Sequence, residues 1–303
     1  MIGTTLRNEL TAEQVGCFIE EQQLPYGFRA IIDHHYLPLS RWLVAKQPSA
    51  GTFLLAINGA QGSGKTTLAA FLKLALEQEY KQNVAVLSID DFYLTKSQRA
   101  RLAREVHPLL ATRGVPGTHD VPMLEDCLCR IRQLGKGESL ALPRFDKAND
   151  DRHPADSWPL VRGPADLLIL EGWCVGSVPQ ADKDLLKPVN ALEARQDPTG
   201  VWRRYVNDQL QGPYARLNTL YDALVFLQVP DFDTVFRWRA EQEEKLATTA
   251  GTAANSLMSR GRIRHFMQYF ERLTRANLDC LPGLADVICK LDTNHDCIES
   301  CYK

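Results

Sequence analysis

The segment Gly59-Ala60-Gln61-Gly62-Ser63-Gly64-Lys65-Thr66 decides the fold of this chain, because it satisfies the pattern G-x-x-x-x-G-K-[ST]. An apolar run at residues 53–57 precedes it and predicts a buried strand. Apolar residues then recur at helical spacing over residues 65–80 and predict an amphipathic helix. Together these elements predict a phosphate site, since the turn aims backbone N–H groups at one point where the helix dipole favours an anion.

The same segment supplies the residues that we expect to contact a nucleotide. Lys65 can reach the β- and γ-phosphates, and the Thr66 hydroxyl can bind Mg²⁺. We therefore predict ATP and Mg²⁺ as cofactors and count Lys65 among the catalytic groups. The predicted nucleotide-binding residues are Gly59, Gln61, Gly62, Ser63, Gly64, Lys65, Thr66 and Thr67.

Composition narrows the class of protein. The 303 residues are 45% hydrophobic and 24% charged, which is ordinary for a globular chain of one large α/β domain or two small ones. A formal net charge of −2 gives no sign of nucleic acid as a bulk partner. We find neither the apolar run of a signal peptide nor one that could span a bilayer, so we expect no membrane partner.

The eight cysteines include no C-x-x-C pair, so we expect no zinc site. Reduced and mostly buried cysteines would suit a cytoplasmic protein.

Residues 1–50 precede the first strand. Thr11 and Gln14 form a capping-box start, and a second helix is expected over residues 39–46. We interpret this part as a helical extension packed on the core, with a docking surface for another subunit as the alternative. Residues 51–303 are predicted to form the P-loop domain, with an insertion at about 175–220 and a lid at about 232–262.

Acidic residues follow two further buried strands. Asp90 and Asp91 come after residues 84–87, and Glu171 comes after residues 167–170. Ligands of parallel sheets bind at the carboxyl ends of the strands. Asp90 is therefore our candidate general base or orienter of an acceptor hydroxyl, and Glu171 is a candidate Mg²⁺ ligand with Thr66. The alternative for each acid is a helix-capping or loop carboxylate.

Five strand-like segments alternate with helices, which predicts a three-layer α/β P-loop fold around a parallel sheet. They are residues 53–57, 84–87, 167–170, 223–229 and 286–291.

A charged helix at 233–246 carries Arg237, Arg239 and Lys245, and Arg239 is our candidate catalytic cation on a lid that closes over the phosphates. The alternative is a solvated helix with ion pairs. A further helix is predicted at 263–273, where Phe266, Tyr269 and Phe270 form an aromatic stripe that we assign to core packing.

Two polar loops, at residues 109–120 and 143–153, are expected to hold the acceptor. These loops and the residues that follow the strand at 84–87 supply the predicted substrate-binding residues. They are Asp91, Tyr93, Arg113, His119, Asp120, Arg144, Lys147 and Arg152. The arginines and the lysine suit a small acidic acceptor, because a guanidinium binds a carboxylate through two hydrogen bonds. A nucleoside would stack on Phe145 or Tyr93, and pantothenate also carries a carboxylate, so these acceptors stay open.

The segment Ser88-Ile89-Asp90-Asp91-Phe92-Tyr93 resembles the second strand end of the uridine kinase, pantothenate kinase and phosphoribulokinase group. More narrowly, the chain is similar to the plant- and fungal-type D-glycerate 3-kinase family. The matching pieces are residues 59–67, 88–95, 113–120, 143–147 with 151–152, 170–173, and 235–239 with 242–246.

The resemblance implies transfer of the γ-phosphoryl group of ATP to a hydroxyl of D-glycerate. It also implies that Asp90 is the catalytic aspartate, that Asp120 and Arg152 lie in loops holding the acceptor, and that Arg239 lies in the lid. A non-catalytic ATP-binding regulator is the alternative from another class, although a pure binder has little need for both Asp90 and Glu171.

Overall fold

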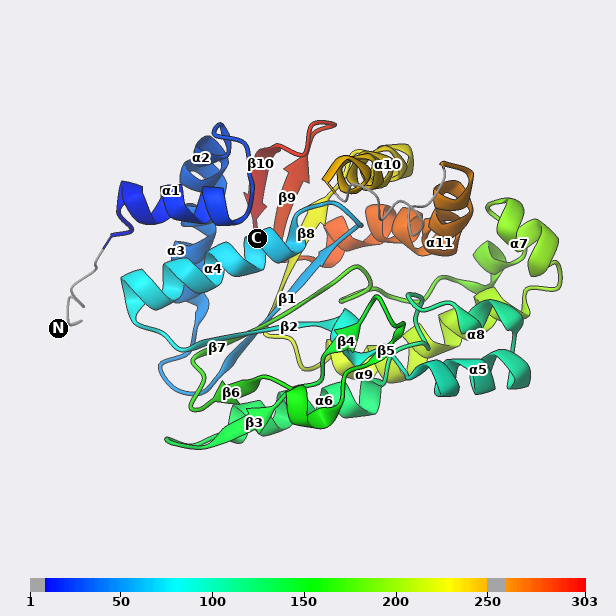
Figure 1. The fold of residues 1–303 in the computed structure, drawn as a ribbon, viewed down its shortest axis with the longest axis horizontal. Helices are drawn as coiled ribbons and strands as arrows, with labels where there is room; N and C mark the ends of the chain where they lie inside the picture. Colours follow the sequence, from blue (N-terminus) through cyan, green and yellow to red (C-terminus); the bar gives the residue numbers. More distant parts are fainter. Residues whose placement is uncertain (1–8, 250–259) are drawn as a thin grey trace.

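The computed structural model describes residues 9–249 and 260–303, and the side chains of residues 9–242 and 261–303. Its centre is a six-stranded sheet (Figure 1) whose strands follow in the order β10 (Cys297–Tyr302), β9 (Val287–Leu291), β8 (Ala223–Gln228), β1 (Phe53–Gly59), β7 (Leu167–Gly172) and β2 (Val84–Ser88). Neighbouring strands are parallel except for β10, which pairs antiparallel with β9 at one edge.

Strand β1 alternates its side chains between two cores. Leu55 and Ile57 face one core, and Leu54 and Ala56 face the other. Because successive side chains of a strand point to opposite faces, a strand covered on both sides is apolar throughout. The first core includes α1 (Ala12–Glu21), α3 (Leu37–Lys46), α4 (Lys65–Tyr80) and α10 (Phe232–Thr249); the second includes α6 (Val121–Gln133), α7 (Ala191–Gln196), α8 (Val201–Gln209) and α9 (Ala215–Asn218).

Helix α11 (Arg260–Leu284) contributes to both cores, and the three layers are visible in Figure 1. Among the described residues, the remaining α-helices are α2 (Phe28–Ile31) and α5 (Lys96–Glu105). Two small antiparallel pairs lie outside the main sheet: β3 (Ser139–Ala141) with β6 (Leu160–Arg162), and β4 (Phe145–Asp146) with β5 (Asp151–Arg152).

All five expected strands are present in the central sheet, which confirms the predicted fold class. The capping box of Thr11 and Gln14 is formed, and α4 has the predicted bounds. Strand β10 was not predicted, because only Cys297 among its residues is buried and the run therefore lacks a hydrophobic period. The pairs β3–β6 and β4–β5 were also missed, in segments too short to carry a pattern.

Two helices are longer than expected. The predicted helix at 39–46 is the end of a helical stretch that begins with α2 and passes through a π-helical turn at Ile32–Tyr36. The prediction at 263–273 covered part of the first half of α11 and missed the second half. Pro38 directly follows the π-helical turn, and the helical stretch continues past it into α3 although this residue has no N–H to donate.

The N-terminal helices share a core with α4: the rings of Phe18 and Phe71 lie 5.4 Å apart, and Leu10 N donates to Glu79 Oε1 at 3.0 Å. The predicted lid, residues 232–262, includes residues 250–259, which lie outside the described residues. Within the ranges that the structure describes, no helix has the length and apolarity to cross a bilayer.

All eight cysteines fall in the described ranges and are free. Four of them are buried, namely Cys127, Cys174, Cys289 and Cys297. Half of the cysteines are therefore buried, where we expected most of them to be.

Candidate active site

A polar cleft of about 420 Å³ lies at the carboxyl ends of β1, β2 and β7. Ten residues predicted for the site line it, namely Gln61, Gly62, Lys65, Thr66, Asp90, Tyr93, Arg113, Lys147, Glu171 and Arg239. The parallel sheet brings them together because Ser88 and Ile57 both stand beside Glu171 in the strand register. Asp90, Glu171 and the P-loop therefore share one cavity.

The glycines of the P-loop are required by its shape. A Cβ on Gly59 would lie 2.4 Å from Ser63 Oγ, and Gly62 and Gly64 have φ angles of +78° and +83°. These left-handed conformations favour glycine. The buried Ser63 Oγ and Gln61 Oε1 have no hydrogen-bond partner among the described residues, which suits a loop shaped around a ligand.

The cleft is lined by three neighbouring polar residues, Lys65, Thr66 and Glu171. Lys65 Nζ donates to Ala60 O at 3.0 Å, and Thr66 Oγ1 donates to Glu171 Oε1 at 3.3 Å. Burial lowers the pKa of Lys65, while the carboxylates of Glu171 and Asp90 oppose this effect. A hydroxyl and a carboxylate oxygen are ligands that Mg²⁺ prefers, so Thr66 and Glu171 fit the predicted metal.

Asp90 follows β2 on a short helical turn that Ser88 caps. Its Oδ1 accepts a hydrogen bond from Tyr93 Oη at 2.8 Å, and its Oδ2 accepts one from Lys147 Nζ at 2.8 Å. Burial alone would raise the pKa of Asp90. The Lys147 ammonium, together with both hydrogen bonds, outweighs burial and keeps this pKa below its ordinary value.

The hairpin β4–β5, which carries Lys147, is tied to the acceptor loops. Arg113 pairs with Asp150 and donates to Lys147 O at 3.3 Å. Arg99, only 1% exposed, pairs with the same Asp150 at 2.7 Å and donates to Leu94 O. Arg99 is therefore buried, and it supports the hairpin.

Four charged residues predicted to contact the acceptor do not line the cleft, and they form two ion pairs beside it. Asp91 pairs with Arg144 and accepts from Phe145 N at 3.3 Å. Asp120 caps α6, because its Oδ1 accepts from Met123 N at 3.2 Å. Its other oxygen lies 3.4 Å from Arg152, which also donates to Tyr93 O at 3.0 Å. These residues position the walls of the cleft.

His119 lies behind Tyr93 and does not line the cleft either. The two rings are stacked with centroids 4.5 Å apart, and His119 Nδ1 lies 2.6 Å from Tyr214 Oη. Burial lowers the pKa of His119 to about 4, although the Asp90 carboxylate opposes the shift. A neutral imidazole therefore supports the ring whose hydroxyl holds Asp90.

Six lining residues were missed, namely Ser88, Gly172, Trp173, Gln242, Phe266 and Phe270. Phe266 and Phe270 belong to the aromatic stripe assigned to core packing, and they also reach the cleft. Phe270 packs edge-on against Trp173 at 4.9 Å, and Trp173 Nε1 donates to Gly114 O at 2.8 Å. The sequence did offer one indication of this part of the cleft, because Trp173 directly follows Glu171 and Gly172 at the end of β7.

Among the three lid cations considered, Arg239 lines the cleft. Arg237 is exposed and donates to Thr234 Oγ1 at 3.0 Å. The side chain of Lys245 lies outside the described residues. The geometry therefore favours Arg239 over Arg237.

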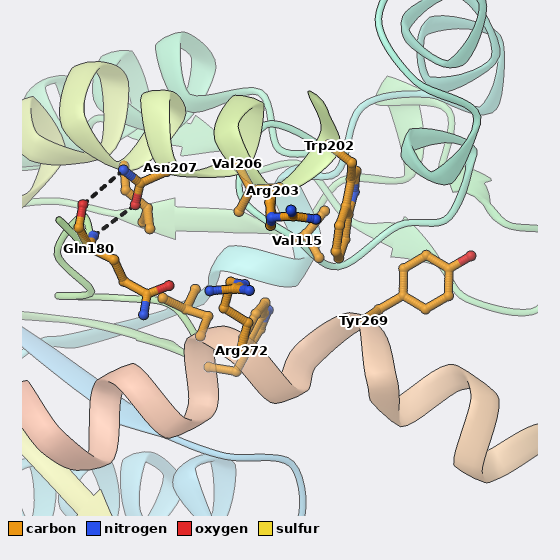
Figure 2. Close-up of a pocket in the computed structure, with 11 residues that line it drawn as sticks. Val115, Gln180, Trp202, Arg203, Val206, Asn207, Tyr269 and Arg272 are labelled. Carbon is orange, nitrogen blue, oxygen red and sulfur yellow. Dashed lines mark hydrogen bonds between the residues drawn. The ribbon is translucent and has the colours of Figure 1, made fainter. Parts of the chain in front are cut away.

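A separate small cavity lies between α8 and α11 (Figure 2), lined by residues that include Arg203, Arg272 and Gln180. Each arginine has an acidic partner: Arg203 pairs with Asp197 at 3.0 Å, and Arg272 pairs with Glu193 at 2.6 Å. Its volume of about 20 Å³ is room for water only. The pair of Arg272 with Glu193 links the predicted insertion to α11, the pair of Arg203 with Asp197 lies within the insertion, and neither pair forms an acceptor site.

The chain is similar in sequence and in structure to known kinases. No family model matches the chain. The chain is 34% identical over 207 residues to "Uncharacterized kinase mug58" of Schizosaccharomyces pombe, covering 66% of this chain and 73% of that protein. It is 30% identical over 243 residues to the chloroplastic D-glycerate 3-kinase of Arabidopsis thaliana, covering 74% of this chain but 50% of the plant enzyme.

A solved structure of D-glycerate 3-kinase from Cryptococcus neoformans superposes with a TM-score of 0.74 at 25% identity, covering 89% of this chain and 99% of that one.

Proposed function

Because the chain belongs to the D-glycerate 3-kinase family of P-loop kinases, we propose that it transfers the γ-phosphoryl group of ATP to a hydroxyl of D-glycerate. The family makes the protein an ATP-dependent kinase; the acceptor is the proposal. The observation that carries it is that two cations, Arg113 and Lys147, line the same cleft as Asp90 and Lys65. A small acceptor with a carboxylate and a hydroxyl matches this arrangement of charges.

The P-loop forms the phosphate end of the proposed site. Lys65 would turn from Ala60 O to the β- and γ-phosphates, and Thr66 and Glu171 would hold Mg²⁺. Bound Mg²⁺ neutralises negative charge on the β- and γ-phosphate oxygens. Arg239 would place a further positive charge at the transferred group from α10.

The contact between Lys147 and Asp90 links binding of the acceptor to the basicity of Asp90. An acceptor carboxylate bound by Arg113 and Lys147 would draw Lys147 away from Asp90. The main opposing charge would then be gone, and burial would raise the pKa of Asp90. Binding of the acidic acceptor would thus make Asp90 a better proton acceptor.

In the transfer step, Asp90 accepts the proton of the acceptor hydroxyl. The hydroxyl oxygen bonds to the γ-phosphorus while the bond from phosphorus to the β,γ-bridging oxygen breaks, and ADP leaves. The residues of the cleft supply position and charge, without a phosphoenzyme.

A nucleoside acceptor is less well supported. Phe145 is 7% exposed, and the guanidinium carbons of Arg99 and Arg113 both lie 5.5 Å from its ring centroid. Tyr93 is only 4% exposed, because His119 stacks on its ring and Phe145 packs edge-on against it. Neither ring proposed as a stacking partner therefore has a free face of the kind that a base needs.

The test is ADP release with ATP and Mg²⁺ against D-glycerate, L-glycerate, pantothenate, uridine and buffer. We expect release to depend on D-glycerate, and Asp90→Asn to lower kcat by about 10²- to 10⁴-fold with ATP affinity unchanged. Release driven by another compound would reject D-glycerate and keep the kinase. Near wild-type kcat in Asp90→Asn would reject the role of Asp90.

A further inference from the structure

Part of the cleft is lined by aromatic rings, although its other lining side chains are charged or polar. Trp173, which directly follows β7, lines the cleft together with Phe266 and Phe270 of α11. The Phe270 ring packs edge-on against Trp173 at 4.9 Å and against Phe266 at 5.0 Å, so the three rings form one continuous surface. We call these three residues the aromatic wall. No step of the proposed phosphoryl transfer uses them.

The aromatic wall lies at the acceptor end of the cleft. Trp173 Nε1 donates to Gly114 O at 2.8 Å, and a Cβ on Gly114 would lie 2.6 Å from Phe270 Cε1. Gly114 directly follows Arg113, whose guanidinium we propose to bind the acceptor carboxylate. The rings therefore lie against the loop that holds one end of the acceptor.

The aromatic wall is held in place by its surroundings. Trp173 O accepts hydrogen bonds from two buried amides, Asn58 Nδ2 at 3.2 Å and Asn277 Nδ2 at 3.3 Å. Trp173 and Phe270 are each 4% exposed, and Phe266 is half-buried. Close-packed side chains of this kind resist displacement by a ligand. The phenyl rings also offer no hydrogen-bond partner to a hydroxyl pressed against them, and a buried hydroxyl without a partner costs free energy.

We propose that the aromatic wall sets the length of the acceptor and selects three-carbon hydroxy acids over longer ones. The inference rests on the proposed kinase function. Arg113 and Lys147 fix the acceptor carboxylate and Asp90 fixes the reacting hydroxyl, so the protein sets the distance between the two ends of the acceptor. A hydroxy acid with one more CHOH group reaches the same two points only by bending outward, and the bend presses a carbon and its hydroxyl against the aromatic wall.

The test measures kcat/KM for D-glycerate and for its four-carbon analogue D-erythronate, with saturating ATP and Mg²⁺. Phe266→Ala removes the half-buried ring of the aromatic wall, and Phe270→Leu replaces the ring that contacts both others. Tyr269→Ala is the matched control, because Tyr269 lies on the same helix and lines the small cavity of Figure 2 but not the cleft. The readout is the ratio of the two kcat/KM values, from which the concentration of folded enzyme cancels.

We expect the wild-type protein to prefer D-glycerate, and Phe266→Ala and Phe270→Leu each to move the ratio towards D-erythronate by about tenfold or more. Tyr269→Ala should keep the wild-type ratio. Equal use of both acids by the wild-type protein would overturn the inference, as would a wild-type ratio in both variants of the aromatic wall; the kinase proposal stands in either case. If the wild-type protein phosphorylated neither acid, the proposed function itself would fail, and this inference with it.

Discussion

Lys147 Nζ lies 2.8 Å from Asp90 Oδ2, while the other oxygen of Asp90 accepts the hydroxyl of Tyr93 at 2.8 Å. Each carboxylate oxygen thus already accepts one hydrogen bond, and an acceptor hydroxyl would use a remaining lone pair or replace one of the two donors. The Lys147 side chain is 62% exposed, whereas Tyr93 is 4% exposed and stacked on His119. Of the two donors, Lys147 therefore has room to move, whereas Tyr93 is held in place beside Asp90.

Lys147→Met tests this exchange. A hydrogen bond to a charged group contributes about 1.5–3 kcal/mol, so we expect KM for the acidic acceptor to rise by about 10- to 100-fold. The pKa of Asp90 should rise as well, because burial is no longer opposed by the ammonium. The acid limb of kcat/KM should then shift to higher pH, which a pH profile measures.

Two further variants serve as controls for Lys147→Met. Lys147→Arg keeps the charge and should lose less acceptor affinity. Lys136→Met removes an exposed lysine outside the cleft and should change neither constant. An unaltered KM and pH profile in Lys147→Met would show that Lys147 neither binds the acceptor nor controls Asp90.

His119→Asn tests the support behind Tyr93. The folded-state pKa of His119 is lowered to about 4, below its ordinary value of about 6.5. The unfolded chain therefore binds more protons between these pH values, and stability falls as pH drops from about 6.5 towards 4, by at most about 3 kcal/mol. Asn can keep a hydrogen bond to Tyr214 without titrating, so this part of the pH dependence should disappear.

Denaturant unfolding at pH 4.5 and 7.5 measures the effect on wild type and variant. His34→Asn, at an exposed position, serves as the control and should keep the wild-type difference between the two pH values. The assignment to His119 fails if His119→Asn loses as much stability at low pH as the wild-type protein does.

Glu171→Gln tests the proposed Mg²⁺ ligand. The amide can still accept from Thr66 Oγ1 but lacks the negative charge. The Mg²⁺ concentration for half-maximal activity should rise by about tenfold or more at saturating ATP. Glu105→Gln, on the exposed face of α5, should leave the Mg²⁺ titration unchanged. An unchanged titration in Glu171→Gln would remove this residue from the metal site.

Gly114→Ala tests the contact between the acceptor loop and α11. Gly114 has a φ of +132°, and an added Cβ would lie 2.6 Å from Phe270 Cε1. We expect a loss of about 1–3 kcal/mol in stability and a higher acceptor KM, since Phe270 must leave Trp173. Gly16→Ala meets no atom within 4 Å and should be neutral for KM. Equal behaviour of the two variants in unfolding and kinetics would refute this account.

The P-loop, the strands and the strand-end acids could be predicted because local patterns specify them. Residues 53–57 are apolar since both faces of β1 are covered, and Gly59 is required by the position of Ser63 Oγ. Asp90 and Glu171 could be placed together because parallel strands end at one edge. The cytoplasmic location stays a prediction.

The remaining features depend on contacts between distant segments. Nothing local distinguishes Arg99, which supports the hairpin, from its solvated neighbours on α5. His119 and Arg152 carry polar groups typical of a binding site, yet they are used to hold Tyr93. Phe270 has the spacing of a core residue and lines both a core and the cleft. Only the tertiary structure separates these roles.

The central claim is that this cleft phosphorylates D-glycerate. The most direct measurement follows ATP, Mg²⁺ and D-glycerate by phosphorus-31 NMR, with wild-type protein and Asp90→Asn side by side. The account predicts a phosphomonoester signal of phosphoglycerate that grows as ADP forms with the wild type and is nearly absent with the variant. ADP and inorganic phosphate without phosphoglycerate from the wild-type protein would contradict it.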